Sequence, residues 1–159
     1  GVYEHIGKDC MEDWIKSIAA CLKEGGIGVI SSTGYLSPHL IHFFISKYIF
    51  PGATLPDYSK TLHLMEKYGL TVLDMENLWP HYMETFRAWY DNFEKNWKEL
   101  KKTNPSYYTE RKRRIWEIYL FSTEQAFTKY GSNLNVFQVV FTKGRDPKYY
   151  PLTRDFLYK

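Results

Sequence analysis

The stretch IGVISST, residues 27–33, decides the fold class. It is a short run rich in Ile and Val without helical periodicity, as expected of a buried strand. The preceding residues 9–24 have the pattern of an amphipathic helix, in which Asp9 and Glu12 fit a capping box and Gly25-Gly26 end the helix. Its apolar face comprises Met11, Trp14, Ile15, Ile18 and Leu22. A helix leading directly into a buried strand is typical of an α/β protein.

The remaining chain continues this alternation of helices and strands. Further strands are predicted at LTVLDM (70–75) and NVFQVVFTK (135–143). Apolar spacing predicts helices at 38–48 and 58–68, and two long helices at about 83–102 and 107–130. The inward candidates of the two long helices are Phe86, Trp89, Phe93, Trp97, Leu100, Ile115, Tyr119, Ala126 and Tyr130. We therefore predict one α/β domain over residues 1–144 and an irregular tail over 145–159.

Composition excludes several classes of protein. Charged residues make up 25% and hydrophobic residues 44% of the 159 residues, which is typical neither of disordered nor of membrane-spanning chains. A net charge of +3 is too small to indicate nucleic-acid binding, so no nucleic-acid partner is expected. Two cysteines are too few for a disulfide framework and fit a reducing cytoplasm. The 18% aromatic content indicates a bulky core or a large apolar cavity.

Five stretches together resemble one family in order and spacing. They are VYEHIG (2–7), KYIFPGATLP (47–56), LWPHYMETFRAWY (78–90), ERKRRIWEIYL (110–120) and NVFQVVF (135–141). Over nearly all of residues 2–144 the chain resembles the cyclopropane-fatty-acyl-phospholipid synthases and their mycolic-acid relatives. The resemblance implies a doubly wound, S-adenosylmethionine-dependent methyltransferase fold, with long inserted helices covering the acyl site. It also implies that this chain is the C-terminal part of a longer enzyme, whose cofactor loop lies upstream, and that the chain alone is inactive.

The resemblance implies an activity and its setting. The parent enzyme would add a methylene to the cis double bond of a phospholipid acyl chain, working in the cytoplasm and peripherally at the inner membrane surface. Methyl transfer to an alkene leaves a carbocation, so the site must be dry and lined by side chains that tolerate positive charge, as aromatic faces do. A base must then remove a proton. Because half of the parent sheet would be exposed in this chain, we also expect a homo-oligomer.

The family's base is a bound bicarbonate, and three residues carry over to its site. By motif, Glu4 of YEHIG and Tyr82 of PHYMET match two of the groups that hold it. The family's histidine corresponds to Ser31, which can donate one hydrogen bond but cannot carry a positive charge. This departure leaves open whether bicarbonate is held by another group or replaced by another base. It also leaves open whether a ring or only a methyl group is formed.

Other residues are candidates for binding. His5 is assigned to the cofactor, although a helix-entry role fits equally well. The substrate candidates are Tyr48, Phe50, Leu55, Trp89 and Gln138. Each has a structural alternative: a rigid loop for the first three, a core helix position for Trp89 and an outward-facing strand position for Gln138. The run Arg111–Arg114 fits a solvated helix face with at most a modest contact to anionic headgroups. No third ligand accompanies His39 and His42, so no metal is expected.

Two further readings of the sequence stay open. One is a methyltransferase for an amine or another small acceptor, which a short or polar pocket would favour. The other is a non-catalytic lipid-binding module that kept the fold and lost the chemistry, which Ser31 keeps open.

Overall fold

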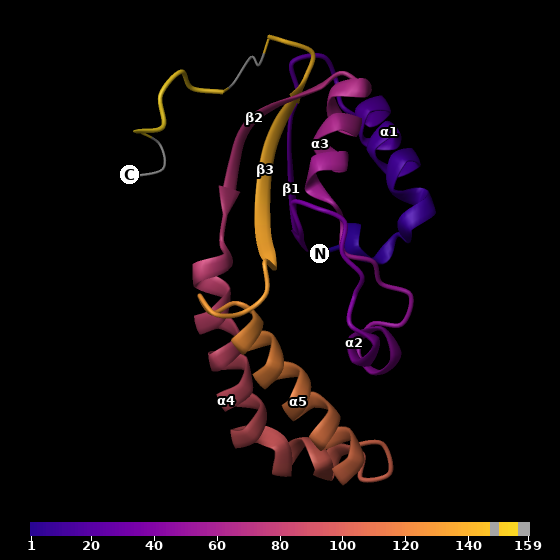
Figure 1. Ribbon diagram of the computed structural model, residues 1–159, viewed down its shortest axis with the longest axis vertical. Coiled ribbons are helices and arrows are strands. Elements are labelled where there is room, and N and C mark those ends of the chain that lie inside the picture. The colour runs from indigo at the N-terminus through magenta and orange to yellow at the C-terminus, as the bar shows by residue number, and fades with distance from the viewer. Residues whose placement is uncertain (147–149, 156–159) are drawn as a thin grey trace.

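The computed structural model describes residues 1–146 and 150–155, and its centre is a three-stranded sheet (Figure 1). The strands are β1 (Ile27–Gly34), β2 (Leu70–Asn77) and β3 (Asn135–Lys143), in the order β1-β3-β2. The central strand β3 is antiparallel to both neighbours, with Ser31 opposite Gln138 and Thr33 opposite Val136. The last strand of the sequence therefore joins two strands that run parallel to each other.

One face of the sheet is covered by α1 (Met11–Cys21) and α3 (Tyr58–Lys67), which lie side by side (Figure 1). Ile15, Met65 and Val139 are fully buried between these helices and the sheet. The polar groups here are paired, since the Tyr3 hydroxyl lies 2.9 Å from Thr61 Oγ1. This is the main hydrophobic core.

The element types are as the sequence predicts, but several boundaries differ. The helix expected at 9–24 spans only Met11–Cys21; its N-cap is Cys10, whose side chain makes no capping bond, so the predicted capping box is wrong. Asp9 instead lies in a short 3₁₀ turn. The helix expected at 38–48 shrinks to α2 (Phe43–Tyr48), which begins after His42, whose backbone is extended and whose Nδ1 accepts the Phe44 N–H. The opening VYEHIG forms a 3₁₀ turn at Tyr3–His5.

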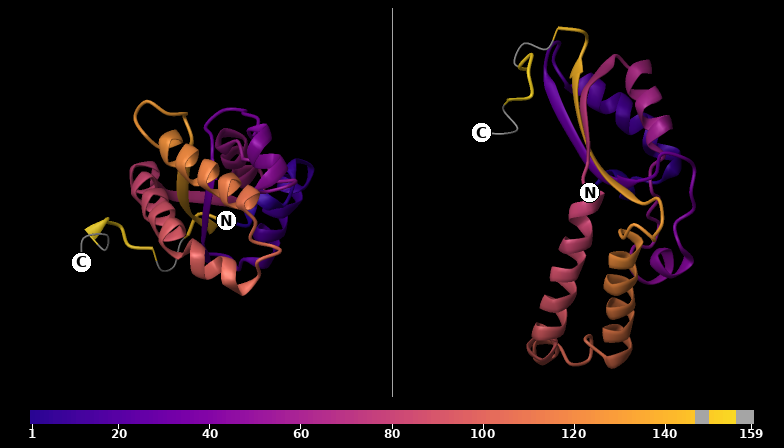
Figure 2. Two further views of the ribbon diagram at one scale, coloured as in Figure 1. Left: turned by 90° about the horizontal axis from the view of Figure 1, so that it is seen from below. Right: turned by 60° about the vertical axis from the view of Figure 1, so that its left-hand side comes forward.

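The two long helices form a hairpin that extends beyond the end of the sheet (Figure 2). They are α4 (Trp79–Thr103), which follows β2 almost directly, and α5 (Glu110–Ala126). A second core lies at the base of the hairpin, where Phe86, Leu120 and Phe127 pack against Val136 of β3. Three predicted inward residues are wrong: Trp89 is 49% exposed, Leu100 is 37% exposed, and Tyr130, which lies beyond the end of α5, is 86% exposed.

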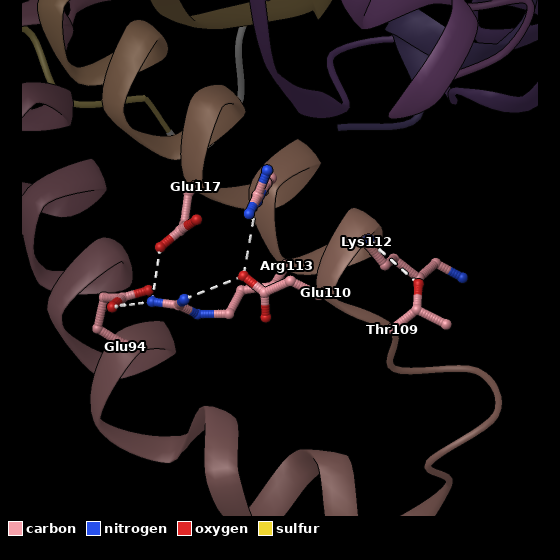
Figure 3. A network of polar contacts seen from close by, with 7 residues as sticks. Glu94, Thr109, Glu110, Lys112, Arg113 and Glu117 are labelled. Carbon is pink, nitrogen blue, oxygen red and sulfur yellow. Dashed lines mark hydrogen bonds and ion pairs between the residues drawn. The ribbon is translucent and has the colours of Figure 1, made fainter.

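Ion pairs join the two helices along the hairpin. Arg113 of α5 lies 2.8 Å from Glu94 of α4 and 2.8 Å from Glu117, and it also contacts Glu110 at 3.4 Å (Figure 3). Nearer the sheet, Arg87 of α4 lies 3.0 Å from the buried Glu124 of α5. These contacts fix the register of one helix against the other.

The described part of the tail contacts Asp74 of β2, to which the Tyr150 hydroxyl donates at 3.3 Å. Arg154 donates two hydrogen bonds to the Asp74 carboxylate, at 2.6 and 2.7 Å. Residues 150–155 form neither an α-helix nor a strand. The rest of the expected tail beyond Asp146, residues 147–149 and 156–159, lies outside the described residues. None of the helices in the described ranges is long and apolar enough to span a bilayer.

Candidate active site

A cavity of about 290 Å³ lies where the base of the hairpin meets α2 and the N-terminal turn. Its walls are mainly aromatic: Phe50, Tyr82, Phe86, Trp89, Tyr119 and Phe127. The rings contact one another in edge-on, tilted and stacked pairs; the Phe50–Tyr119 centroids, for example, are 5.7 Å apart at 90°, and the Phe86–Phe127 planes are stacked at 25°. Interlocked rings of this kind form a rigid apolar wall.

Glu4 carries the charge at this cavity. Its Oε1 accepts the Thr33 N–H at 2.7 Å, and its backbone carbonyl accepts the Thr54 N–H at 2.8 Å. Its Oε2 is buried and has no hydrogen-bond partner among the described residues; the Gly1 amino group lies 3.8 Å away. A buried carboxylate oxygen without a hydrogen-bond partner is costly, which indicates that a bound group with a proton to donate would be stabilised there.

Hydroxyl groups of the hairpin helices line the same cavity. Tyr82 comes from α4, and its ring lies 5.4 Å from that of Phe127. Tyr119 and Thr123 come from α5, and the buried Thr123 Oγ1 has no hydrogen-bond partner among the described residues. Burial, and secondarily the nearby Tyr82, raises the pKa of Tyr119 to about 12. Its phenol is therefore protonated near neutral pH and is not available as a base.

Six of the nine predicted site residues line this one cavity: Glu4, His5, Phe50, Leu55, Tyr82 and Trp89. The His5 ring meets the edge of Phe50 at 5.4 Å. Trp89 lies at the rim, with half of its surface exposed. The structure thus brings the N-terminal turn, the 50–55 loop and α4 together, although they are far apart in the sequence.

Three predicted residues are not among those lining the cavity. Ser31 is exposed on the sheet face that α1 and α3 leave open, two residues before Thr33, which does line the cavity. Gln138 lies directly opposite Ser31, so its side chain shares that face. Tyr48 ends α2, and its ring contacts Phe44 and the Arg111 guanidinium rather than the cavity.

Among the lining residues that were not predicted as site residues, three carry hydroxyl groups: Thr33, Tyr119 and Thr123. A signal existed for the last two, because Tyr119, Thr123 and Phe127 follow one another at four-residue spacing and thus share a helix face. Thr33 enters through its backbone N–H, which no side-chain motif reveals. Together the site offers one carboxylate, several hydroxyls and aromatic faces, a set that suits a cationic reacting group screened from water.

Comparison with known proteins now decides the family. The model of the mycolic acid cyclopropane synthetase family matches residues 1–139. The chain belongs to this family. Its resemblance to cyclopropane synthases, expected from five sequence stretches, is confirmed.

Relatives in the family act on lipids according to their names. A probable fatty acid methyltransferase of Pseudomonas putida is 28% identical over 167 residues, covering 100% of this chain and 41% of the relative. The tuberculostearic acid methyltransferase UfaA1 of Mycobacterium tuberculosis is 35% identical over 85 residues, covering 53% of this chain and 19% of the relative. The chain therefore spans less than half the length of these relatives.

Solved structures confirm the fold class. The cyclopropane synthase MmaA2 from Mycobacterium tuberculosis has a TM-score of 0.78 at 21% identity, over 90% of this chain and 53% of that one. CmaA1 complexed with SAH and CTAB gives 0.78 at 20% identity, with the same coverage of the two chains. The chain thus has the α/β fold of part of these S-adenosylmethionine-dependent methyltransferases. A phosphoethanolamine N-methyltransferase of Haemonchus contortus has a TM-score of 0.69 at 19% identity, covering 90% of this chain and 32% of that one, which extends the fold likeness to an amine methyltransferase.

Proposed function

We propose that the protein carrying this chain is an S-adenosylmethionine-dependent methyltransferase that adds a methylene to the cis double bond of a phospholipid acyl chain. The observation that carries this proposal is that Glu4 and Tyr82 line one aromatic cavity and that the buried Oε2 of Glu4 has no hydrogen-bond partner among the described residues. The family match and the fatty acid methyltransferase relative support a lipid acceptor.

The residues present fit both proposed small groups. The aromatic faces of Phe50 and Trp89, the His5 ring and the Glu4 carboxylate would border the sulfonium of S-adenosylmethionine, which supplies the methyl group when bound. Glu4, Tyr82 and the Thr123 hydroxyl would hold bicarbonate. The carboxylate can accept the hydrogen bond of a protonated oxygen, while the hydroxyls of Tyr82 and Thr123 can donate.

The roles of the chain's own residues follow from their chemistry. The ring walls exclude water, which would otherwise capture a carbocation. Glu4, fixed by the Thr33 and Thr54 N–H groups, would accept at Oε2 a hydrogen bond from the hydroxyl of bicarbonate and so orient it. Tyr82 orients a group that removes a proton from the new methyl carbon. Ser31 has no role in this scheme, because its side chain lies on the open sheet face.

Expression of the whole gene in cells with unsaturated phospholipids, followed by mass spectrometry of their lipids, tests this proposal. We expect unsaturated acyl chains to gain one methylene, and Glu4→Gln to abolish the gain. Glu76→Gln, at an exposed carboxylate of β2, is the matched control and should keep it. The 159-residue chain alone should give no transfer. Acyl chains that stay unchanged in cells expressing the folded wild-type protein would contradict the proposal. A methylene gain as large with Glu4→Gln as with wild type would contradict it too.

A methyltransferase for an amine or another small acceptor is the second candidate. The observation favouring it is the cavity volume of about 290 Å³, which is at the lower limit for ligand pockets. The same extracts distinguish the two candidates, because a methylated amine would appear while the acyl chains stay unchanged. Phospholipid bound without any methylated product would instead indicate a non-catalytic lipid-binding module.

A further inference from the structure

We propose that the far end of the α4–α5 hairpin, residues 95–114, is a docking surface for an anionic phospholipid bilayer. We call these residues the hairpin tip. The purpose of this docking rests on the proposed function, since an enzyme acting on membrane acyl chains must reach them. The surface itself is argued below from charge, exposure and an adjoining apolar groove.

Positive charge is concentrated at the hairpin tip. It holds eight Lys and Arg residues and two Glu residues, a net charge of +6 in a chain whose total is +3. The rest of the chain is therefore net negative. Lys95, Lys98 and Lys101 are exposed and form no ion pair within residues 1–146 and 150–155, and Arg111 is exposed beside the Tyr48 ring. Such an asymmetric field attracts an anionic surface.

Not every cation at the tip is available for binding. Arg113 is held by Glu94, Glu110 and Glu117 inside the hairpin (Figure 3). Lys102 pairs with Glu99 at 2.7 Å, and Arg114 lies 3.6 Å from Glu110. Both acidic residues of the tip thus form ion pairs with Lys102, Arg113 or Arg114. This leaves Lys95, Lys98, Lys101 and Arg111 to bind an external partner.

An apolar groove connects the tip with the candidate active site. It has a volume of about 450 Å³ and is lined by Phe50, Trp89, Phe93, Leu100, Trp116 and Tyr119, among others. Phe50, Trp89 and Tyr119 also line the cavity that holds Glu4 and Tyr82. From Trp89 to Leu100 the helix rises about 16 Å. The groove therefore offers an acyl chain an apolar path from the tip toward the site.

Exposed rings and apolar side chains at the tip favour a membrane over a nucleic acid. Tyr107 is 54% exposed, with the Lys112 ammonium 3.0 Å from its ring centre, and Leu100 is 37% exposed. Amphipathic rings beside cations are typical of membrane–water interfaces. A nucleic acid would bind the cations through its phosphates but would leave the apolar groove empty. An acidic carrier protein fits the tip less well than a bilayer does, because it has no extended anionic plane to match several cations spread over the surface.

Vesicle sedimentation with the protein expressed from its whole gene tests the proposal. Vesicles contain phosphatidylglycerol and phosphatidylcholine, or phosphatidylcholine alone. We expect a strong, salt-sensitive preference for the anionic vesicles. The triple variant Lys98→Gln, Lys101→Gln and Arg111→Gln should bind them roughly 100-fold more weakly. The control Lys16→Gln, Lys23→Gln and Lys60→Gln removes the same charge from exposed positions away from the tip and should bind like wild type.

Three outcomes would overturn the proposal. They are equal binding to both vesicle types, equal loss of binding in the two triple variants, and tighter binding to RNA or to an acidic protein than to anionic vesicles at the same salt concentration. Circular dichroism establishes that both variants fold. Because sedimentation needs neither cofactor nor turnover, its result is separable from the proposed function. Normal vesicle binding without methylene gain would contradict the function alone.

Discussion

Thr123 and Thr61 both have a buried hydroxyl, but only the Thr61 hydroxyl has hydrogen-bond partners among the described residues. Thr123 lines the cavity and its Oγ1 has no hydrogen-bond partner among the described residues. Thr61 Oγ1, in contrast, contacts the Tyr3 hydroxyl and the Asp57 carbonyl, each at 2.9 Å. A hydroxyl that serves the fold is satisfied within it. An unsatisfied one, kept at a cavity, points to a ligand.

Substituting these two threonines by valine should therefore have opposite effects. Thr123→Val removes an unpaired group, so its free energy of unfolding should change by less than about 1 kcal/mol, while methyl transfer by the whole protein falls about tenfold or more. Thr61→Val leaves the Tyr3 hydroxyl unpaired in the core and should cost about 1–3 kcal/mol. Urea denaturation and a transfer assay measure the pair. A destabilised but fully active Thr123→Val would contradict the ligand role.

Tyr119 predicts a pH dependence at the base of the hairpin. Burial raises the pKa of its phenol to about 12, so the folded chain keeps the proton that the unfolded chain loses above pH 10. Stability contributed by this group is present below pH 10 and is lost as pH rises toward 12, by up to about 2–3 kcal/mol. The melting temperature should thus fall less steeply between pH 9 and pH 11.5 in Tyr119→Phe than in wild type. Parallel curves would show that Tyr119 does not carry the effect.

Sequence motifs could predict part of the site at this scale. Glu4 and Tyr82 belong to recognisable stretches, and both line the cavity. Ser31 and Gln138 are not among the residues that line the cavity, and their positions depend on strand pairing: the two face each other on the open side of the sheet. Register of this kind is set by contacts between distant strands and is not visible in either stretch alone.

At the scale of elements, the hairpin depends on charge placed between its helices. Arg113 is shared by Glu94 and Glu117, and burial, followed by the neighbouring Glu94 carboxyl, raises the pKa of Glu117. Without the guanidinium, two carboxylates would face each other across the helix pair. The arginine therefore holds together groups that otherwise repel.

Arg113→Gln should accordingly lower the melting temperature at pH 7–8 by a few degrees, and by less near pH 4. The sign follows because the raised pKa favours the neutral carboxyl, and protonation on acidification relieves the repulsion. Differential scanning calorimetry at both pH values measures this. Arg114→Gln, at the exposed neighbour that contacts only Glu110 at 3.6 Å among the described residues, is the control. A loss that is equal at the two pH values would contradict the account.

Element types followed from periodicity, whereas element ends did not. The strands begin and end within two residues of expectation, since β-branched runs bounded by glycine or polar residues mark them well. The capping box at Asp9 failed because a 3₁₀ turn takes up that residue before α1 starts. The turn just before it, Tyr3–His5, is held by a tertiary contact that no local motif reveals, the hydrogen bond from the Thr54 N–H to the Glu4 carbonyl.

At the scale of the whole molecule, the sheet has an incomplete edge. Among the described residues β1 pairs with no other strand than β3. Residues 1–4 lie against β1, where the Gly1 amino group donates a hydrogen bond to the Ser31 carbonyl. Val29 is left 60% exposed. Unpaired strand edges with apolar side chains favour self-association.

The 159-residue chain should therefore form dimers or larger assemblies, and Val29→Lys should shift it toward the monomer because edge lysines oppose strand pairing. Light scattering after size-exclusion chromatography, over a concentration series, measures the mass. Val72→Lys, on the other outer strand, tests whether the effect belongs to the β1 edge. A wild-type chain that stays monomeric at high concentration would contradict this expectation.

The central claim concerns two distant residues: Glu4 and Tyr82 act on one reaction in one aromatic cavity. A double-mutant cycle on methyl transfer by the whole protein, with Glu4→Gln, Tyr82→Phe and both together, tests it most directly. Groups that act as a unit are non-additive, so the double variant should be about as slow as the slower single variant. If instead the two rate losses multiply, Glu4 and Tyr82 act independently and the account is contradicted.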